Sequence, residues 1–544
     1  MVKLHWIASL GAGLNDLMKI ILKNYRCFPD SRPAQIEIKP GFTSFIGTNN
    51  CGKSSLLKFF HEFRALFQFM SSFSANFLQA LQQNSASGFQ LSFILDVAEI
   101  FTNTNARDLT MSFEVVVDGS FIPRGPVPER ILVTVPNRTS SFRAQIMTNL
   151  GQLEWGKFVI EEPLLRKNTA GEILADLSPY LSEFRALAGT LYIGPFRNAI
   201  NVGTKDNYFD IQVGTSFISR WRSLKTGNDK RGNELIMRIT DDIARIFDLE
   251  QLQIDASEDG QTLQVFVNRK SYKLPELGSG LTQFILVLGN AAIRQPSYIL
   301  IDEPELNLHP SLMLDFLTTL GSYAKQGVIF CTHNIGLARA AADRIYSLRR
   351  IGEGETQLGE YEATPRLSEF LGEMSFAGYR ELGVERVLLV EGSTDVKTVQ
   401  QFLRLLKKDH KVVLMSLGGA SMINGKSEDQ LLEITRISSN ISALIDSERL
   451  INGAPLAPGR QAFAEACART RIGCHVLDRR ATENYLSDRA IKRVMGDSFR
   501  SLHPFESLRE ASPAWSKSEN WKIAREMTLT ELENTDLGAF LDSL

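Results

Sequence analysis

Two segments far apart in the chain carry residue types that suit phosphate chemistry. The first runs Gly-Thr-Asn-Asn-Cys-Gly-Lys-Ser from Gly47 to Ser54 and has the spacing of a phosphate-binding loop. Its glycines let backbone N–H groups turn inward around a triphosphate, and the positive end of the following helix strengthens the attraction. We expect Lys53 to reach the β- and γ-phosphates and Ser54 to bind Mg²⁺. The residues expected to line the nucleotide are Gly47, Asn49, Asn50, Gly52, Lys53, Ser54 and Ser55.

The second segment, Tyr298–Pro304, is typical of a buried strand that ends in two carboxylates. Such a strand delivers its acids to the edge of a sheet. We expect Asp302 to hold the magnesium ion and Glu303 to polarise the attacking water. Either segment alone could arise by chance, but both in this order predict an ATPase that uses ATP and Mg²⁺.

Three shorter segments resemble parts of ABC-type ATPase heads. Ser279 and Gly280 begin a predicted helix, and the resemblance implies that they bind a γ-phosphate seated in the partner subunit's loop; the chain has Gly-Ser-Gly where the family has Ser-Gly-Gly. His309 lies in a segment similar to the dimer-contact loop of those heads. His333 resembles the switch histidine that senses the γ-phosphate, although a strand-end histidine can also be a structural hydrogen-bonding group. The resemblance implies ATP sandwiched between two heads, and therefore self-association.

The segment Leu-Lys-Asn-Tyr-Arg that ends at Arg26 is similar to the start of clamp-type ATPases related to chromosome-maintenance and DNA-repair heads. The resemblance implies that Arg26 lies near the nucleotide. A structural ion pair explains an arginine at this position equally well, so both interpretations stay open.

The C-terminal third carries acids directly after two apolar runs. Glu391 and Asp395 follow the first run, and Asp446 and Glu448 follow the second. Acids at the carboxyl ends of neighbouring parallel strands meet in one crevice, where like charges resist joint ionisation. Mg²⁺ or Mn²⁺ relieves that repulsion, and two such ions can activate water and stabilise the leaving oxygen of a phosphodiester.

This arrangement resembles the Toprim domain, which has a glutamate after its first strand and an acid-x-acid pair after a later one. The usual pair is Asp-x-Asp, and here it is Asp446-Ser447-Glu448. The resemblance extends to a glycine-rich turn at residues 417–420, to Glu483 as a further metal ligand, and to Lys522 as a phosphate-stabilising lysine. Lys522 could equally be an exposed helical lysine. The predicted catalytic residues are Glu303, His333, Glu391, Asp446, Glu448 and Lys522, and the predicted metal ligands are Ser54, Asp302, Glu391, Asp395, Asp446, Glu448 and Glu483.

An ABC-like head followed by Toprim is the layout of the OLD (overcoming lysogenization defect) family nucleases, which this chain resembles over nearly its whole length. The resemblance implies metal-dependent DNA cleavage gated or scaffolded by the ATPase. It also implies a role in antiphage defence, beside a partner such as a helicase or a reverse transcriptase with its retron DNA.

Other classes compete with this interpretation. The main alternative is a non-cleaving, ATP-driven DNA clamp or scaffold whose C-terminal acids are only structural. A topoisomerase or primase is less favoured, because no room remains after the acids for a module with a nucleophilic tyrosine. Coupling to a transporter is least favoured, because no membrane-docking feature is evident.

Bulk properties bound the fold that must position these residues. The chain has 544 residues, which exceeds a single core, and a formal net charge of −2, so any DNA contact must come from a local patch. Five scattered cysteines and the absence of a bilayer-length apolar run favour a reduced, cytoplasmic setting without a membrane partner. Residues 1–17 are either a peripheral extension or part of the fold, and the sequence favours neither interpretation.

The pattern predicts a mixed α/β chain with two domains. Residues 1–380 form the ABC-type head, with a helical dimerisation element inserted at about 160–250, and residues 381–544 form the Rossmann-like Toprim domain. The individual elements expected are strands at 18–22 and 42–46, a helix at 54–69, an antiparallel sheet within 89–160, helices at 171–188 and 217–247, and C-terminal strands near 386–390, 412–416, 442–445 and 474–477.

Overall fold

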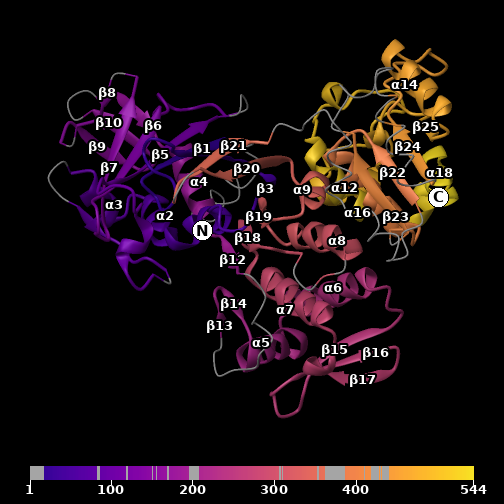
Figure 1. Cartoon of the computed structure of the whole chain (residues 1–544), viewed down its shortest axis with the longest axis horizontal. Coiled ribbons are helices and arrows are strands. Elements are labelled where there is room, and N and C mark those ends of the chain that lie inside the picture. The colour runs from indigo at the N-terminus through magenta and orange to yellow at the C-terminus, as the bar shows by residue number, and fades with distance from the viewer. Residues whose placement is uncertain are drawn as a thin grey trace. The chain divides into compact units, whose positions relative to one another are not determined.

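A computed structural model of the chain forms two compact units, which are described separately (Figure 1). The N-terminal unit comprises Met1–Leu306, Tyr323–His333 and Tyr346–Glu360, and the C-terminal unit comprises Asn307–Ser322, Asn334–Ile345 and Tyr361–Leu544. The structure describes residues 17–82, 86–92, 94–117, 121–149, 151–154, 156–167, 171–194, 207–305, 308, 310–351, 354–361, 386–409, 411–417, 428, 431 and 440–544. His309, residues 418–420 and residues 1–16 of the expected N-terminal extension therefore lie outside the described residues, whereas Leu17 begins strand β1 (Leu17–Lys23).

A six-stranded sheet of order β12-β18-β19-β3-β20-β21 organises the N-terminal unit. The pairs β12·β18, β18·β19 and β19·β3 are parallel, and every residue of β18 and β19 is buried, which explains their uninterrupted apolar sequences. This arrangement confirms the expected parallel sheet. The strands are β12 Leu191–Ile193, β18 Tyr298–Asp302, β19 Gly327–Thr332, β3 Gly41–Gly47, β20 Arg344–Arg350 and β21 Thr356–Glu360.

A second, antiparallel sheet has the order β2-β1-β5-β6-β7-β4, with β8 paired to β7. Along β7 every second residue is buried, so the alternating sequence faces a core on one side only. The antiparallel region expected within residues 89–160 is confirmed. The strands are β1 Leu17–Lys23, β2 Ala34–Ile38, β4 Ser87–Gly88, β5 Leu109–Val116, β6 Arg130–Val135, β7 Ser141–Thr148 and β8 Gly151–Gln152.

Two predicted helices differ from those observed. The helix expected at 54–69 is interrupted at Phe63, between α1 Lys53–Glu62 and α2 Arg64–Met70. The helix expected at 171–188 begins only at Ser178 as α4, because Ile173–Asp176 pairs as strand β11 with its neighbour β10. The remaining elements of this region are α3 Ala75–Ala80, η1 Val97–Ile100, β9 Phe158–Glu161, β10 Leu164–Lys167 and α4 Ser178–Ala188.

The helices expected at 217–247 are present as α5 Gly214–Thr226 and α6 Lys230–Ile246. On α6 the isoleucines at 236, 239, 243 and 246 are buried, as an amphipathic helix requires. Their role in dimerisation stays a prediction. The neighbouring elements are β13 Asn207–Tyr208, β14 Ile211–Gln212, β15 Leu252–Ala256, β16 Leu263–Val267, β17 Lys270–Lys273, η2 Leu274–Glu276 and α7 Ser279–Arg294.

The C-terminal unit contains a four-stranded sheet of order β23-β22-β24-β25, in which all three pairs are parallel (Figure 1, orange). All four predicted C-terminal strands are present. The strands are β22 Arg386–Val390, β23 Val412–Ser416, β24 Ile441–Ile445 and β25 Gly473–Val476. The helices that follow are α12 Ser393–Leu405, α14 Pro458–Arg469, η5 Thr482–Tyr485, α15 Asp488–Met495, η6 Leu508–Glu510, η7 Lys517–Glu519, α16 Asn520–Arg525, α17 Leu529–Leu532 and α18 Asp536–Ser543.

Helices α8 Pro310–Gly321 and α9 Ile335–Ala341 belong to the C-terminal unit although they precede residue 381. Helix α12 joins them through buried ion pairs, Arg404 Nη2 to Asp315 Oδ1 at 2.5 Å and Lys397 Nζ to Asp343 Oδ1 at 2.8 Å. The unit is therefore assembled from three stretches of sequence. No helix in the described part of the chain combines the length and the apolar character needed to cross a membrane.

Candidate functional site

The sheet of the N-terminal unit brings the predicted phosphate-binding residues to one edge. Strand β3 leads into the phosphate loop, and its parallel neighbour β19 ends at Thr332 beside the end of β18 at Asp302. Gly52 has φ +96°, and a Cβ there would lie 2.5 Å from Cys27 Sγ. Only glycine fits both the backbone and the space at this turn into helix α1.

Lys53 lies within the loop it was expected to serve. Its Nζ donates to the carbonyls of Gly47 at 2.9 Å and Thr48 at 3.0 Å, and lies 3.4 Å from His333 Nδ1. The side chain is 5% exposed. None of these three contacts is a carboxylate. Because a buried ammonium is stabilised by a negative charge, this arrangement favours the binding of an anion.

Asp302 and Ser54 are also brought together. Burial raises the pKa of Asp302, and a hydrogen bond with Ser54 opposes that shift. Asp302 Oδ1 is buried and has no hydrogen-bond partner among the described residues. An orphaned carboxylate oxygen beside a hydroxyl fits the donor set of a Mg²⁺ ion whose remaining ligands come from phosphates and water.

The second acid, Glu303, contacts the predicted switch histidine. His333 Nε2 lies 2.8 Å from Glu303 Oε1, so His333 links Glu303 to Lys53. Glu303 has φ +52°, and its N–H donates to the carbonyl of Cys331 at 3.0 Å. A left-handed backbone at a non-glycine residue costs on the order of 1 kcal/mol and is common where a side chain must be aimed at a site.

Glu305 also contributes, and the sequence patterns did not identify it. Its Oε1 accepts hydrogen bonds from Thr332 Oγ1 at 2.6 Å and from the backbone N–H of His333 at 3.0 Å. It therefore orients the strand end that carries the histidine. The available signal was a third acid in the run Asp-Glu-Pro-Glu.

Arg26 forms the structural ion pair that the sequence left open. Its Nη2 lies 2.5 Å from Glu62 Oε1, at the end of helix α1. Ser279 and Gly280 begin helix α7, where Ser279 is exposed. The hydrogen bonds and ion pairs of the described residues connect neither of them to the phosphate loop. Asn49 and Asn50 are exposed, and Ser55 accepts a hydrogen bond from Tyr25 Oη through its carbonyl at 3.0 Å.

In the C-terminal unit, four acids meet where strands β22 and β24 end. The backbone N–H of Asp446 donates to Glu391 Oε1 at 2.8 Å. Asp446 Oδ1 accepts from the backbone N–H of Thr482 at 3.0 Å, which ties strand β24 to the turn that carries Glu483. Asp395 lies in the first turn of α12 and accepts from the N–H of Gly392 at 3.0 Å.

The pKa values of two acids reflect this convergence. Burial raises the pKa of Asp446 well above its usual value, and the charges of Asp395, Glu391 and Glu483 raise it further. Desolvation by the surrounding protein raises the pKa of Asp395 to about 7, with Glu391 and Glu483 adding to the shift and Lys517 opposing it. The neighbouring carboxyls therefore disfavour one another's ionisation at this site.

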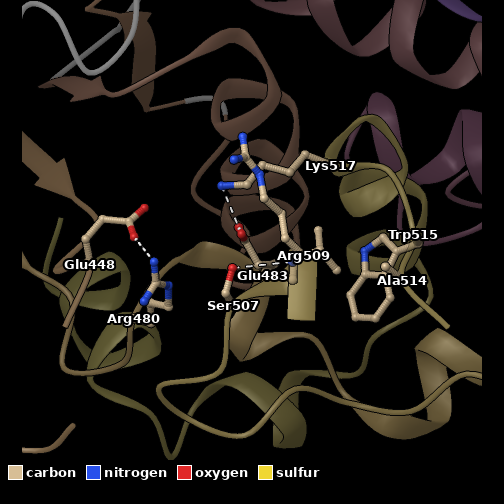
Figure 2. A pocket seen from close by; sticks show the side chains of 9 residues that line it. Glu448, Arg480, Glu483, Ser507, Arg509, Ala514, Trp515 and Lys517 are labelled. Atoms are coloured by element: carbon tan, nitrogen blue, oxygen red, sulfur yellow. Dashed lines mark hydrogen bonds and ion pairs between the residues drawn. The ribbon is translucent and has the colours of Figure 1, made fainter. Parts of the chain in front are cut away.

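Three cations neutralise the other acids. Arg460, from helix α14, pairs with both oxygens of Glu391 and donates to the carbonyl of Asp446. Arg480 Nη2 lies 2.6 Å from Glu448 Oε2, and Lys517 Nζ lies 2.9 Å from Glu483 Oε1 (Figure 2). Across the described residues, no three His, Cys, Asp or Glu side chains lie together in an arrangement that holds a metal ion as it stands. The acid types suit a cation, but their present partners are basic side chains.

Of the two interpretations that the sequence left open for Lys522, its ion pair favours the lysine on a helical surface. Lys522 Nζ pairs with Glu519 Oε2 at 2.9 Å on the same helical surface. The lysine that reaches the acids is Lys517. Burial lowers the pKa of Lys517, but Glu483, Asp446 and Asp395 together raise it above its usual value. Both lysines flank Trp521 in sequence, and only the path of the chain decides which one faces the acids.

Comparison with known proteins supports the first of these sites. Residues 16–122, which include the phosphate loop, match the AAA ATPase domain family. The glutamate transport ATP-binding protein GluA of Corynebacterium efficiens is 33% identical over 84 residues, which is 15% of this chain and 35% of that protein. The protein of the same name from Corynebacterium glutamicum matches to the same extent. The chain spans about a third of the length of these curated relatives, and it contains an AAA-type ATPase domain.

Solved structures include weakly similar chains. The SMC head domain from Thermotoga maritima has a TM-score of 0.32 at 16% identity, covering 64% of this chain and 99% of that one. An Smc head domain with an extended coiled coil, bound to the C-terminal domain of ScpA derived from Pyrococcus furiosus, has a TM-score of 0.33 at 12% identity, covering 66% and 99%. Similarity of this degree supports no conclusion about fold or function.

Proposed function

We propose that this chain binds and hydrolyses ATP in its N-terminal unit and cleaves DNA with a divalent cation in its C-terminal unit, as the OLD family nucleases do. The observation that carries the nuclease part is the meeting of Glu391, Asp395, Asp446 and Glu483 at the ends of β22 and β24, with pKa values raised at Asp395 and Asp446.

The ATPase part is supported by the phosphate loop and by the match to the AAA ATPase domain family. Lys53 would bind the β- and γ-phosphates, and Ser54 and Asp302 would hold Mg²⁺. Glu303, which contacts His333, would accept a proton from the water that attacks the γ-phosphorus. Ser279 and Gly280 would serve a second copy of the chain, so that ATP joins two heads.

The metal of the C-terminal unit would be held by Asp395, Asp446 and Glu483. Their donor chemistry fits a hard cation, because Asp446 and Glu483 are each 4% exposed and Glu483 Oε2 has no hydrogen-bond partner among the described residues. Mg²⁺ or Mn²⁺ bound there would polarise the phosphodiester and activate water. Lys517 would hold the negative charge of the phosphate, while Arg460 and Thr482 keep Glu391 and Asp446 in position.

The ion pairs of the acids favour one alternative, a non-cleaving ATP-driven clamp on DNA. Glu391 and Glu448 are both neutralised by arginines, which is how purely structural acids are stabilised. The role in antiphage defence and the partners named above, a helicase or a reverse transcriptase with its retron DNA, rest on the OLD resemblance alone.

A plasmid-nicking assay in Mg²⁺, Mn²⁺ or EDTA separates the two functions. We expect nicking that requires the metal and is lost by about 100-fold or more in Asp446→Asn, which keeps an acceptor for Thr482 but lacks the charge. Asp488→Asn, an exposed carboxylate on α15, is the matched control. Full activity of Asp446→Asn would exclude the assignment. ATP-dependent retention of DNA without nicking in any metal would establish the clamp.

A further inference from the structure

A cavity of about 520 Å³ lies in the C-terminal unit beside the acids (Figure 2). This volume is within the usual range for sites that hold small ligands. Most of its wall comes from a single stretch of chain, residues 507–517, which runs through η6 into η7. The lining residues are Glu448, Arg480, Glu483, Ser507, Leu508, Arg509, Ala514, Trp515 and Lys517.

One part of the cavity is cationic. Arg480 and Lys517 are each committed to one carboxylate, but Arg480 Nη1 is buried without a hydrogen-bond partner among the described residues. Arg509 is exposed at the cavity and forms no ion pair with any described residue. Three cations against two acids leave a net positive charge, and a guanidinium fork matches the oxygens of a phosphate.

The remaining wall is apolar and rigid. Leu508 and Trp515 are buried in the core of the unit, and Ala514 lies next to the indole. Trp515 Nε1 donates to Asn520 Oδ1 at 2.9 Å, so the ring is held in one orientation. Figure 2 draws the indole on one side of the cavity and the Glu448–Arg480 pair on the other, with Glu483 between them. A fixed aromatic wall binds flat rings with little loss of conformational entropy.

We propose that this cavity binds a single nucleotide of the DNA strand, with its phosphate against Arg509 and Arg480 and its base against Leu508, Ala514 and Trp515. The proposal deepens the proposed nuclease function and rests on it, since the bound nucleotide is the one next to the phosphodiester that the acids would cleave. Glu483 lines the cavity and also belongs to the acid cluster, which places this nucleotide directly beside the predicted metal.

The test measures binding without catalysis. Calorimetric titration in EDTA uses the full chain carrying Lys53→Ala, so that the phosphate loop does not contribute. The probes are thymidine 5′-monophosphate, thymidine, inorganic phosphate and a single-stranded tetranucleotide. We expect the monophosphate to bind at least about tenfold more tightly than thymidine or phosphate, since only it fills both parts of the cavity. The tetranucleotide should bind at least as tightly; binding of the monophosphate but not of the tetranucleotide would identify a site for free nucleotides and overturn the proposal.

Variants identify the cavity as the site. Arg509→Ala should weaken the monophosphate at least about fivefold, whereas Arg493→Ala, an exposed arginine on α15, should leave it unchanged. Trp515→Phe, which keeps the apolar wall, should retain binding while removing the quenching of tryptophan fluorescence by the base. Equal binding by Arg509→Ala, or phosphate binding as tightly as the monophosphate, would overturn the proposal. If the protein binds the nucleotide but never nicks DNA, the proposed nuclease function is refuted and the cavity assignment stands. If the protein nicks DNA but does not bind the nucleotide, the cavity assignment is refuted and the nuclease function stands.

Discussion

The two charged sites of this chain differ in whether their charged side chains are paired with an opposite charge. In the N-terminal unit, Lys53 lies against two backbone carbonyls and an imidazole. In the C-terminal unit, Glu391, Glu448 and Glu483 each have their own arginine or lysine. In the first site these contacts give the ammonium no carboxylate partner. The second is internally neutralised, so a metal or a phosphate must compete with a basic side chain that is already in place.

Both sites nevertheless share a backbone feature. Glu303 and Glu448 follow the ends of β18 and β24, and both have a left-handed backbone, at φ +52° and +53°. At Glu303 the turn aims the carboxylate at His333, whereas at Glu448 it aims the carboxylate at Arg480. The same local geometry thus directs a carboxylate to a histidine in one unit and to an arginine in the other, because the neighbouring elements differ.

The largest effect should come from Lys53→Ala. Removing the single ammonium of the phosphate loop leaves the triphosphate without its cation, and we expect ATP affinity to fall by about 100-fold or more. Calorimetry with ATP and Mg²⁺ measures the loss, and Lys58→Ala, in the same helix, is the control. Unchanged ATP affinity would show that the loop containing Lys53 does not bind the nucleotide.

Arg460→Ala should reveal how strongly the second site depends on its own cations. It leaves the buried Glu391 without its cationic partner, with only the N–H of Asp446 donating to it, and we expect the free energy of unfolding to fall by about 3 kcal/mol. Arg469→Ala, in the same helix but exposed, should lower the free energy of unfolding much less, because solvent screens its ion pair with Glu428. Urea denaturation measures both.

The same variant also distinguishes a metal site from a structural cluster. If the acids bind a cation, Mn²⁺ should restore part of the stability lost in Arg460→Ala, because the ion replaces the missing charge. No recovery at millimolar Mn²⁺ would favour the structural role of the acids.

Asp395→Asn should remove a smaller, pH-dependent contribution. The pKa of Asp395 is raised to about 7, so the folded chain holds a proton that the unfolded chain releases above about pH 4. The free energy of unfolding of the unsubstituted chain should therefore fall as the pH rises from about 4 to 7. We expect Asp395→Asn to flatten this slope, by about 1–3 kcal/mol over the range, in urea titrations at successive pH values. Parallel curves for the two proteins would contradict the assignment.

Lys522→Ala should have the smallest effect. Lys522 makes a partly exposed ion pair with Glu519 and its Nζ lies 5.9 Å from the centroid of the Trp521 ring, so stability should change by less than about 1 kcal/mol and nicking should not change. Lys517→Ala, tested in parallel, should reduce nicking because it removes the cation that contacts Glu483. Loss of nicking in Lys522→Ala would instead support Lys522 as the phosphate-stabilising lysine that the Toprim resemblance implies.

Local sequence patterns predicted that Lys53, Asp302 and His333 would lie together, but they did not identify Glu305. The signals are local: a glycine-lysine-serine loop, an apolar run that ends in acids, and a strand that ends in histidine. Parallel strands that pair place their carboxyl ends at the same edge of the sheet, which brings these signals together. The sequence also determined that Glu391 and Asp446 would meet, for the same reason.

The contacts of those acids depend on the packing of segments that are distant in sequence. Arg460 comes from helix α14 and Lys517 from the 3₁₀ helix η7, and no spacing in the sequence links either to Glu391 or Glu483. Packing likewise placed helices α8 and α9 in the C-terminal unit, and pairing with β10 made Ile173–Asp176 a strand. Long-range side-chain contacts depend on how distant segments pack against one another, whereas backbone periodicity and loop chemistry are fixed by residues adjacent in the chain.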